Sequence, residues 1–373
     1  MTQHWITPDA VFDGEKLHKG MSVLVDQNTV LDLSISVPNG APVQTIAGII
    51  SAGFVDLQVN GGGGILLNMT PTVAGMSAIA AAHRQFGTVA ILPTVITDAP
   101  EVLAAVVDAA ISAKGADGIA GLHIEGPHIS DARRGTHAGQ FIRLMDDLTI
   151  AHVARLRNAD IAVMITLAPE AVTAAQIAEL NRLGAVVSLG HSDGTAEMTR
   201  NALDAGAQCF THLYNAMSPM LNRAPGVVGA AINSDAFAGI ICDGIHVADE
   251  MLGLAIRARP IKDRMFLVSD AMPTVGGPDH FDLYGQTISL KNGELVNEEG
   301  SLAGAHVTQL EGVARLVSHV GVSVEDALRM AITVPAKLMG LDLLATLKGR
   351  KLCDVIHLDP AFGVANALPH PKT

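Results

Sequence analysis

The sequence predicts an α/β fold: a TIM-like (β/α)8 barrel with a small β-sandwich domain built from the N- and C-terminal segments. The 373 residues exceed the usual size of one hydrophobic core, but a closed barrel can accommodate most of them. From about residue 51 onward, short β-branched runs alternate with longer Ala-rich segments of helical period. The composition is 49% hydrophobic but only 3% aromatic, with 37 glycines, which suits close packing of helices on a buried parallel sheet.

Counting the apolar runs yields eight expected barrel strands. They span residues 53–59, 89–95, 119–125, 161–167, 185–191, 208–213, 238–242 and 265–270. Segments of helical period separate most of them, as in residues 72–86, 100–114, 172–183 and 196–205. Eight such units close into a barrel.

The two ends of the chain differ from this repeating pattern. Residues 21–25 and 30–35 flank a polar turn and resemble a hairpin, and a similar apolar fragment lies at 353–358. We therefore expect a small β domain from residues 1–50 and 346–373, beside a barrel of residues 51–345. Residues 281–304 predict a hairpin inserted after the eighth strand, around Lys291, Asn292 and Gly293. Two helices, at 307–320 and 324–331, would close the barrel.

The charge and cysteine content exclude several classes of protein. A formal charge of −13 and the absence of any basic block argue against a nucleic-acid surface. The 3 cysteines are scattered, which predicts neither disulfides nor a thiolate zinc site and fits a reducing cytosol. No apolar stretch approaches the roughly 20 residues that cross a bilayer, and residues 1–9 do not look like a signal peptide. We expect a cytoplasmic protein that binds neither nucleic acid nor membrane.

Two carboxylates and two imidazoles each finish one of the expected strands. They are Glu125, His191, His212 and Asp270. Side chains at the carboxyl ends of parallel barrel strands converge on one mouth, so these four can share a site. Two neutral imidazoles and one carboxylate form a common catalytic zinc set, and we assign Glu125, His191 and His212 as the ligands. Asp270 is then free to take a proton from water and return it to a departing amine.

Each of these residues taken alone also has a structural interpretation. A lone histidine at a strand end is more often a hydrogen-bonded structural residue, and a strand-end aspartate often caps the next helix. Four of them at equivalent positions, with Gly126 after Glu125 and Gly190 before His191, favour a hydrolytic metal site.

Six segments together resemble the amidohydrolase superfamily. They are GFVDLQVNGGGG (53–64), GLHIEGPH (121–128), LGHSD (189–193), THLYNAM (211–217), CDGIHV (242–247) and VSDAM (268–272). More narrowly, they look like the family of N-acetylglucosamine-6-phosphate deacetylases, and the likeness runs from about residue 51 to 341. The resemblance implies the same ligands, Glu125, His191 and His212, with Asp270 as catalytic acid and base. It also implies release of acetate from N-acetylglucosamine 6-phosphate in amino-sugar catabolism.

The resemblance further implies a set of substrate contacts. His137, in the segment RGTH, matches a family histidine on a mobile loop that orients or polarises the acetyl carbonyl. His246 matches one near the sugar phosphate, and Asn215 and Ala216 match a pair at the same end of the substrate. Arg223 corresponds to an arginine that reaches the neighbouring subunit's phosphate, which implies a homodimer. From the residues alone, the favoured interpretation of Arg223 is an exposed loop arginine without a partner, whereas for His246 the two interpretations are even.

The end of the first strand bears on the number of metal ions. Many amidohydrolases have His-x-His there, whereas this chain has Gln58 and Asn60. Amides are poor ligands beside imidazoles, so we expect one divalent metal, zinc, with Gln58 as at most a weak or water-mediated contact. His123 shares strand parity with Glu125 and is expected to orient a ligand from deeper in the barrel. His306 would approach the mouth if the inserted hairpin folds back, but we do not count it among the expected substrate contacts.

Two alternatives to this function stay open at the level of sequence. The same chemistry could act on another N-acyl amino sugar, such as N-acetylgalactosamine 6-phosphate, or on an N-acyl amino acid; Arg223 and His246 favour a phosphorylated ligand. A barrel that has lost catalysis and acts as a ligand sensor is the other alternative, and the presence of all four site residues argues against it.

Overall fold

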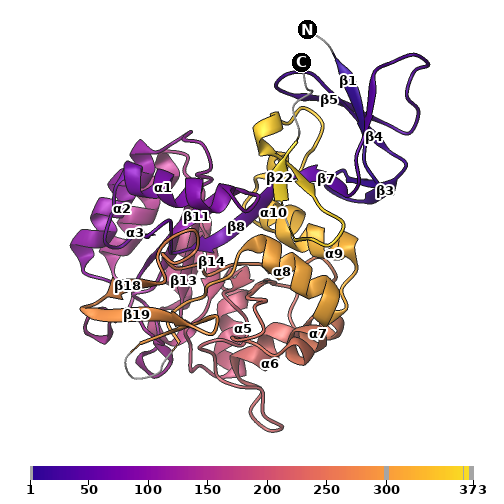
Figure 1. The fold of residues 1–373 in the computed structure, drawn as a ribbon. Helices are drawn as coiled ribbons and strands as arrows, with labels where there is room; N and C mark the ends of the chain where they lie inside the picture. Colours follow the sequence, from indigo (N-terminus) through magenta and orange to yellow (C-terminus); the bar gives the residue numbers. More distant parts are fainter. Residues whose placement is uncertain (1–2, 298–301, 364, 369–373) are drawn as a thin grey trace.

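The computed structural model, which describes residues 3–297, 302–363 and 365–368, confirms the barrel (Figure 1). Each barrel strand pairs in parallel with the barrel strand before it in the chain. The strands are β8 (Phe54–Val59), β11 (Thr88–Ile96), β12 (Leu122–Glu125), β13 (Val163–Leu167), β14 (Val186–Leu189), β15 (Cys209–Phe210), β16 (Phe237–Ile240) and β17 (Met265–Leu267). The barrel closes between its first and last strands, where the Asp270 N–H donates to the Gln58 carbonyl at 3.0 Å and Val59 pairs with Ala271.

The later strands are shorter than the apolar pattern predicts. Strands β14, β15, β16 and β17 end at residues 189, 210, 240 and 267, whereas the pattern predicts ends at 191, 213, 242 and 270. The residues just beyond three of these strands have left-handed backbones, with φ of 47° at His191, 30° at His212 and 52° at Asp270. Because a ladder needs extended backbone, pairing stops before these residues. Their side chains therefore do not follow the alternating directions of side chains along an extended strand.

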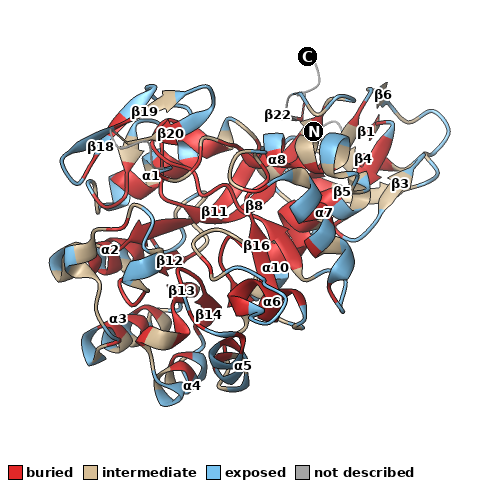
Figure 2. Cartoon of the chain, turned by 90° about the horizontal axis from the view of Figure 1, so that it is seen from below, coloured by how far each residue is buried: buried red, intermediate tan, exposed pale blue. Residues whose placement is uncertain are grey.

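Helices cover the outside of the barrel, and most of them have a buried inward face and an exposed outward face (Figure 2), whereas every residue of Gly226–Ile232 is buried. The four helices expected from periodicity are confirmed, and α3, α6 and α7 occupy further connections. Side chains of Thr72, Asp146, Thr173 and Thr195 accept hydrogen bonds from the first turns of α1, α3, α4 and α5, which sets where these helices begin. The helices are α1 (Val73–Arg84), α2 (Pro100–Ser112), α3 (Asp147–Asn158), α4 (Ala174–Arg182), α5 (Ala196–Asp204), α6 (Gly226–Ile232) and α7 (Asp249–Ala258).

The predicted small β domain is also present, and it joins both ends of the chain. One sheet contains β1 (His4–Thr7), β4 (Ser22–Val25), β5 (Val30–Ser34) and β6 (Val43–Thr45); the other contains β2 (Ala10–Phe12), β3 (Leu17–Lys19), β7 (Ile49–Ala52), β21 (Val355–Leu358) and β22 (Ala365–Ala367). The C-terminal β21 pairs antiparallel with β7, directly before the barrel begins. Ile6, Val11 and Val355 belong to one buried cluster of this domain. The boundary residues themselves stay a prediction.

The segment inserted after β17 forms three strands rather than the predicted hairpin. They are β18 (His280–Leu283), β19 (Gln286–Lys291) and β20 (Glu294–Val296), which we call the inserted sheet. Its second turn has φ of 53° at Asn292 and 86° at Gly293, as a two-residue hairpin turn requires. Residues 298–301 of the predicted segment lie outside the described residues.

The chain then completes the wall of the barrel with short helices. These are α8 (Gln309–Arg315), η4 (Leu316–Val320), α9 (Val324–Leu328), η5 (Arg329–Thr333) and α10 (Val334–Leu338), in the region where two helices were expected. Among the described residues, no helix has both the length and the apolar character needed to cross a membrane.

Candidate active site

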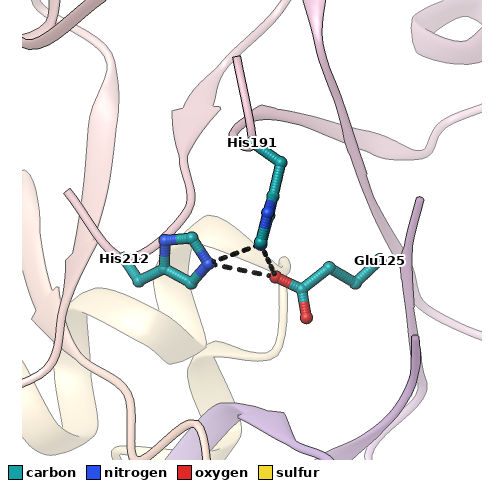
Figure 3. Close-up of side chains that lie close together, drawn as sticks. All are labelled: Glu125, His191 and His212. Atoms are coloured by element: carbon teal, nitrogen blue, oxygen red, sulfur yellow. Dashed lines mark hydrogen bonds and ion pairs between the residues drawn. The ribbon is translucent and has the colours of Figure 1, made fainter. Parts of the chain in front are cut away.

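The three expected metal ligands lie together at the mouth of the barrel (Figure 3). Glu125 ends β12, while His191 and His212 follow β14 and β15. Glu125 Oε1 lies 3.2 Å from His191 Nε2 and 3.1 Å from His212 Nε2, and the two imidazole nitrogens are 3.0 Å apart. All three side chains are buried. Their donor atoms are within 4.8 Å of one another, so a single cation can contact all three.

A backbone carbonyl sets the orientation of the His191 ring. Its Nδ1 lies 2.8 Å from the carbonyl oxygen of Arg133, which can only accept, so Nδ1 carries the hydrogen. When the ring is neutral, as a metal ligand must be, its lone pair is therefore on Nε2, the atom that faces Glu125 and His212. An N–H to carbonyl contact of this kind is usual behind metal-ligating histidines. This donor set fits a divalent metal ion.

The charges within this cluster support each other. Burial acts to raise the pKa of Glu125, but hydrogen bonds and positive charge from His191 and His212 outweigh it and hold that pKa well below its usual value. Burial acts to lower the pKa of His212, but the hydrogen bond and charge of Glu125 outweigh it and raise that pKa. The pair therefore attracts positive charge into a buried position, which a metal cation can supply in place of a proton.

Asp270 lies beside the cluster and is held by two amides. Its Oδ1 accepts hydrogen bonds from Asn60 Nδ2 at 2.7 Å and from Gln58 Nε2 at 3.0 Å. Gln58 Nε2 also lies 3.0 Å from Glu125 Oε1, so one amide joins both carboxylates. Burial and the negative charge of Glu125 raise the pKa of Asp270 to about 6. A buried carboxylate with a pKa near neutrality is suited to exchange protons with water.

His123 lies beneath the site, as strand parity predicts. Its Nε2 is 2.8 Å from Thr166 Oγ1 and its Nδ1 is 3.3 Å from Thr94 Oγ1. Thr166 in turn bonds to Thr211 at 2.6 Å, next to His212. Burial lowers the pKa of His123 to about 4, so the ring is neutral. Its hydrogen bonds thus go to buried hydroxyls, and a role in orienting a ligand stays a prediction.

Four of the expected substrate residues line one cavity with the cluster and Asp270. This cavity has a volume of about 180 Å³. The four are His137, Asn215, Ala216 and His246. They come from the loops after β12, β15 and β16, so the barrel brings together residues that are distant in sequence.

His137 is a neutral imidazole with a defined tautomer. The backbone N–H of Thr97, which can only donate, faces His137 Nδ1 at 3.4 Å, and Thr97 Oγ1 lies 2.7 Å from the same nitrogen. Nδ1 therefore accepts, and the ring hydrogen is on Nε2. Burial, reinforced by His191, lowers the pKa of His137 to about 3. The rings of His137 and His191 are 4.4 Å apart, so the free N–H of His137 lies at the edge of the cluster.

His246 is oriented by its own loop. Its Nδ1 lies 2.6 Å from Asp243 Oδ2, so Nδ1 carries a hydrogen toward that carboxylate. Burial acts to raise the pKa of Asp243, but the hydrogen bond and charge of His246 outweigh it and lower that pKa. The ionised carboxylate of Asp243 therefore fixes the orientation of the His246 ring at this end of the cavity.

Arg223 and His306 do not line this cavity. Arg223 is exposed on the loop between β15 and α6 and does not line the cavity. His306 bonds through Nδ1 to Thr274 Oγ1 at 2.8 Å and is likewise absent from the cavity lining. Within one chain, Arg223 has no part in the site.

Two functional positions were missed by sequence reasoning. Asn60 was considered only as a poor metal ligand, but it donates to Asp270. Asn60 lies two residues after Gln58, which is in β8, and this spacing was a signal that both amides face the barrel interior. Thr97, which holds His137, had no such signal, because it lies just beyond β11 and the contact joins segments 40 residues apart.

The comparisons with known proteins identify the family of this chain. A model of the amidohydrolase family matches residues 49–371. The N-acetylgalactosamine-6-phosphate deacetylase of Shewanella sp. (strain ANA-3) is 40% identical over 318 residues, covering 84% of this chain and 80% of that protein. The N-acetylglucosamine-6-phosphate deacetylase of Haemophilus influenzae is 31% identical over 330 residues, covering 87% and 86%.

A solved structure extends the likeness to nearly the whole chain. The N-acetylglucosamine-6-phosphate deacetylase from Pasteurella multocida superposes with a TM-score of 0.89 at 31% identity, covering 98% of each chain. Membership of this family implies a divalent metal ion, and the cluster of Glu125, His191 and His212 has the donor atoms to bind one. The chain therefore belongs to the amidohydrolase family.

Proposed function

We propose that this chain is a metal-dependent hydrolase that removes the acetyl group from N-acetylglucosamine 6-phosphate, producing glucosamine 6-phosphate and acetate. The observation that carries the proposal is the convergence of Glu125, His191 and His212 beside a carboxylate, Asp270, that is held by two amides. Relatives at 31% identity or more bear the names of amino-sugar 6-phosphate deacetylases.

Glu125, His191 and His212 would hold one zinc ion, with Glu125 Oε1 and the two Nε2 atoms as donors. When bound, the ion polarises the acyl carbonyl and makes water more acidic. The amides of Gln58 and Asn60 donate hydrogen bonds to carboxylates. This donor role supports a single metal ion, because a second ion would need these side chains as ligands.

Asp270 would move the proton in both halves of the reaction. It first accepts a proton from the water that attacks the acetyl carbon. It then donates that proton to the amide nitrogen as the C–N bond breaks, so that a neutral amine leaves. The raised pKa of Asp270, about 6, supports both steps near neutral pH.

His137 would stabilise the negative charge that develops on the acetyl oxygen. Its neutral ring and its hydrogen on Nε2 make it a donor at the cavity edge, next to His191. A donor positioned before reaction begins needs no rearrangement as the charge develops, which is the advantage of a preorganised site.

The phosphate would bind at the opposite end, near His246, Asn215 and Ala216. The ring of His246 is oriented by Asp243, and an imidazole can donate a hydrogen bond to a phosphate oxygen. Arg223 would come from the neighbouring subunit of a homodimer, because its own chain leaves it exposed and away from the cavity. A guanidinium is well shaped for phosphate oxygens.

A second substrate has a specific observation in its favour. The relative with 40% identity is an N-acetylgalactosamine-6-phosphate deacetylase, so the galacto epimer is an alternative for the same chemistry.

The test is to purify the protein, measure bound metal per subunit, and assay acetate release from four sugars. These are the N-acetyl derivatives of glucosamine and galactosamine, each with and without the 6-phosphate. We expect about one metal ion per subunit and turnover of a phosphorylated sugar. Loss of the preference for phosphate, or no acetate from any of the four, would contradict the proposal.

A further inference from the structure

The inserted sheet makes one contact that leads to the active site. Tyr284 is at the first turn of this sheet, between β18 and β19, and its hydroxyl donates to the backbone carbonyl of Thr97. Thr97 is the residue whose N–H and hydroxyl hold Nδ1 of His137. A side chain 187 residues away in sequence thus reaches the support of the proposed oxyanion donor.

The position of Thr97 depends on such a contact because this residue lies just beyond the end of a strand. Strand β11 ends at Ile96, and the following residues up to α2 belong to no regular element. Thr97 is also enclosed: a Cβ at position 126 would lie 2.2 Å from Thr97 Oγ1, so only Gly126 leaves room for it. The carbonyl of Thr97 is held by Tyr284 while its other polar groups face His137.

Tyr284 occupies a position where its residue type is unfavourable. Its φ is 50° and that of Gly285 is 80°, as a two-residue turn between paired Leu283 and Gln286 requires. Glycine or asparagine adopts this backbone more readily than an aromatic residue. A turn that keeps an aromatic side chain at such a position suggests a use for the side chain beyond the turn itself.

The hydroxyl of Tyr284 is also suited to act as a permanent donor. Burial, together with the negative charges of Asp98 and Glu125, raises the pKa of Tyr284 above its ordinary value. The phenol therefore stays protonated at any pH at which the protein would work. Tyr284 and His137 both line a second cavity, of about 810 Å³, between the inserted sheet and the loop at residues 131–142. The inserted sheet and this loop therefore face each other next to His137.

We propose that Tyr284 is a positioning residue for the deacetylation, acting through Thr97 to hold His137 with its Nε2 hydrogen toward the acetyl oxygen. This proposal rests on the function proposed above. It assigns the inserted sheet a role in catalysis rather than only in covering the barrel.

The test compares three variants of the metal-loaded full chain. Tyr284→Phe removes only the hydroxyl, and Tyr284→Asn removes the side chain while placing a favourable residue at the turn. Thr287→Val is the matched control, because it removes a hydrogen bond to Asp282 within the same sheet at an exposed position. We expect both Tyr284 variants to lower kcat by about 2- to 10-fold, the equivalent of one net hydrogen bond, with little change in KM or metal content. Thr287→Val should retain the wild-type kcat.

A second measurement does not depend on turnover. NMR of 15N-histidine-labelled protein, with His137 assigned by its absence in His137→Gln, reports which ring nitrogen carries the hydrogen. We expect a single Nε2–H form in the wild type and a mixture or broadening in Tyr284→Phe. Wild-type protein without acetate release would overturn the proposed function but leave this test intact.

The results that would overturn the positioning role are specific. They are an unchanged kcat with an unchanged His137 spectrum in Tyr284→Phe, or an equal loss of kcat in Thr287→Val. An increased unfolding temperature in Tyr284→Asn together with reduced kcat would support it, because stability and activity would then change in opposite directions.

Discussion

Replacing Asp270 by asparagine should stabilise the metal-free protein while strongly reducing acetate release. The hydrogen bonds from Gln58 and Asn60 reach Oδ1, which an asparagine side chain retains as an acceptor, so we expect the fold to be kept. The substitution removes a buried negative charge that lies close to Glu125. The lost proton acceptor should reduce acetate release by about 10²- to 10⁴-fold.

The size of the stabilisation follows from the pKa of Asp270. Burial and the charge of Glu125 raise that pKa from 3.8 to about 6. Each tenfold change in proton affinity is worth about 1.4 kcal/mol, so ionised Asp270 lowers the free energy of unfolding by about 3 kcal/mol. Between pH 4 and 6 the folded state binds more protons than the unfolded state, so this contribution makes stability fall as pH rises. Below about pH 4 both states are protonated and the destabilisation disappears.

Urea unfolding of chelator-treated protein at pH 7.5 and pH 4 measures this effect. We expect Asp270→Asn to be more stable than the wild type by up to about 3 kcal/mol at pH 7.5, and the two to converge at pH 4. Asp117→Asn, at an exposed carboxylate, is the control and should change little at either pH. A variant less stable than the wild type at pH 7.5, or an advantage that persists at pH 4, would refute the reasoning.

Three further outcomes test the roles of other residues. Glu125→Gln should weaken metal binding by at least about 100-fold, because an amide is a poor ligand; metal analysis after dialysis would show stoichiometric metal if this were wrong. His137→Gln should lower kcat by about 10²- to 10³-fold with metal content unchanged, and a kcat near wild type would exclude an oxyanion role. Arg223→Ala should raise KM for the phosphorylated sugar by about 10- to 100-fold without changing KM for the unphosphorylated sugar. Sedimentation of the wild type should show a dimer. A monomer would contradict the proposal that Arg223 contacts the substrate of the neighbouring subunit.

The barrel was predictable because its signals are local. A run such as residues 163–167 is mostly apolar and is buried along its whole length, as expected of a strand in a parallel sheet. The rule that strand ends converge then placed Glu125 near His191 and His212. The exact strand ends were less predictable. His191 follows an apolar run but has a left-handed φ of 47°, and nothing in the composition of that run shows it.

Contacts between distant loops could not be predicted in the same way. Asn60 holds Asp270 across 210 residues, and Tyr284 reaches Thr97 across 187, so neither pair shares a periodicity or a motif. The inserted sheet has three strands because β19 pairs with both β18 and β20. This pairing depends on the register of the strands rather than on their composition.

Hydrophobic period, strand-end chemistry and the order of short motifs were thus sufficient for the fold class, the family resemblance and the convergence of Glu125, His191, His212 and Asp270. The three-dimensional arrangement decided which groups support them: the amides on Asp270, the Arg133 carbonyl on His191 and the Thr97 contact on His137. The physical reason is that residue type and spacing encode local backbone preference and burial. Hydrogen-bond partners, tautomers and raised pKa values depend instead on which groups the closed barrel places within about 3 Å of each other.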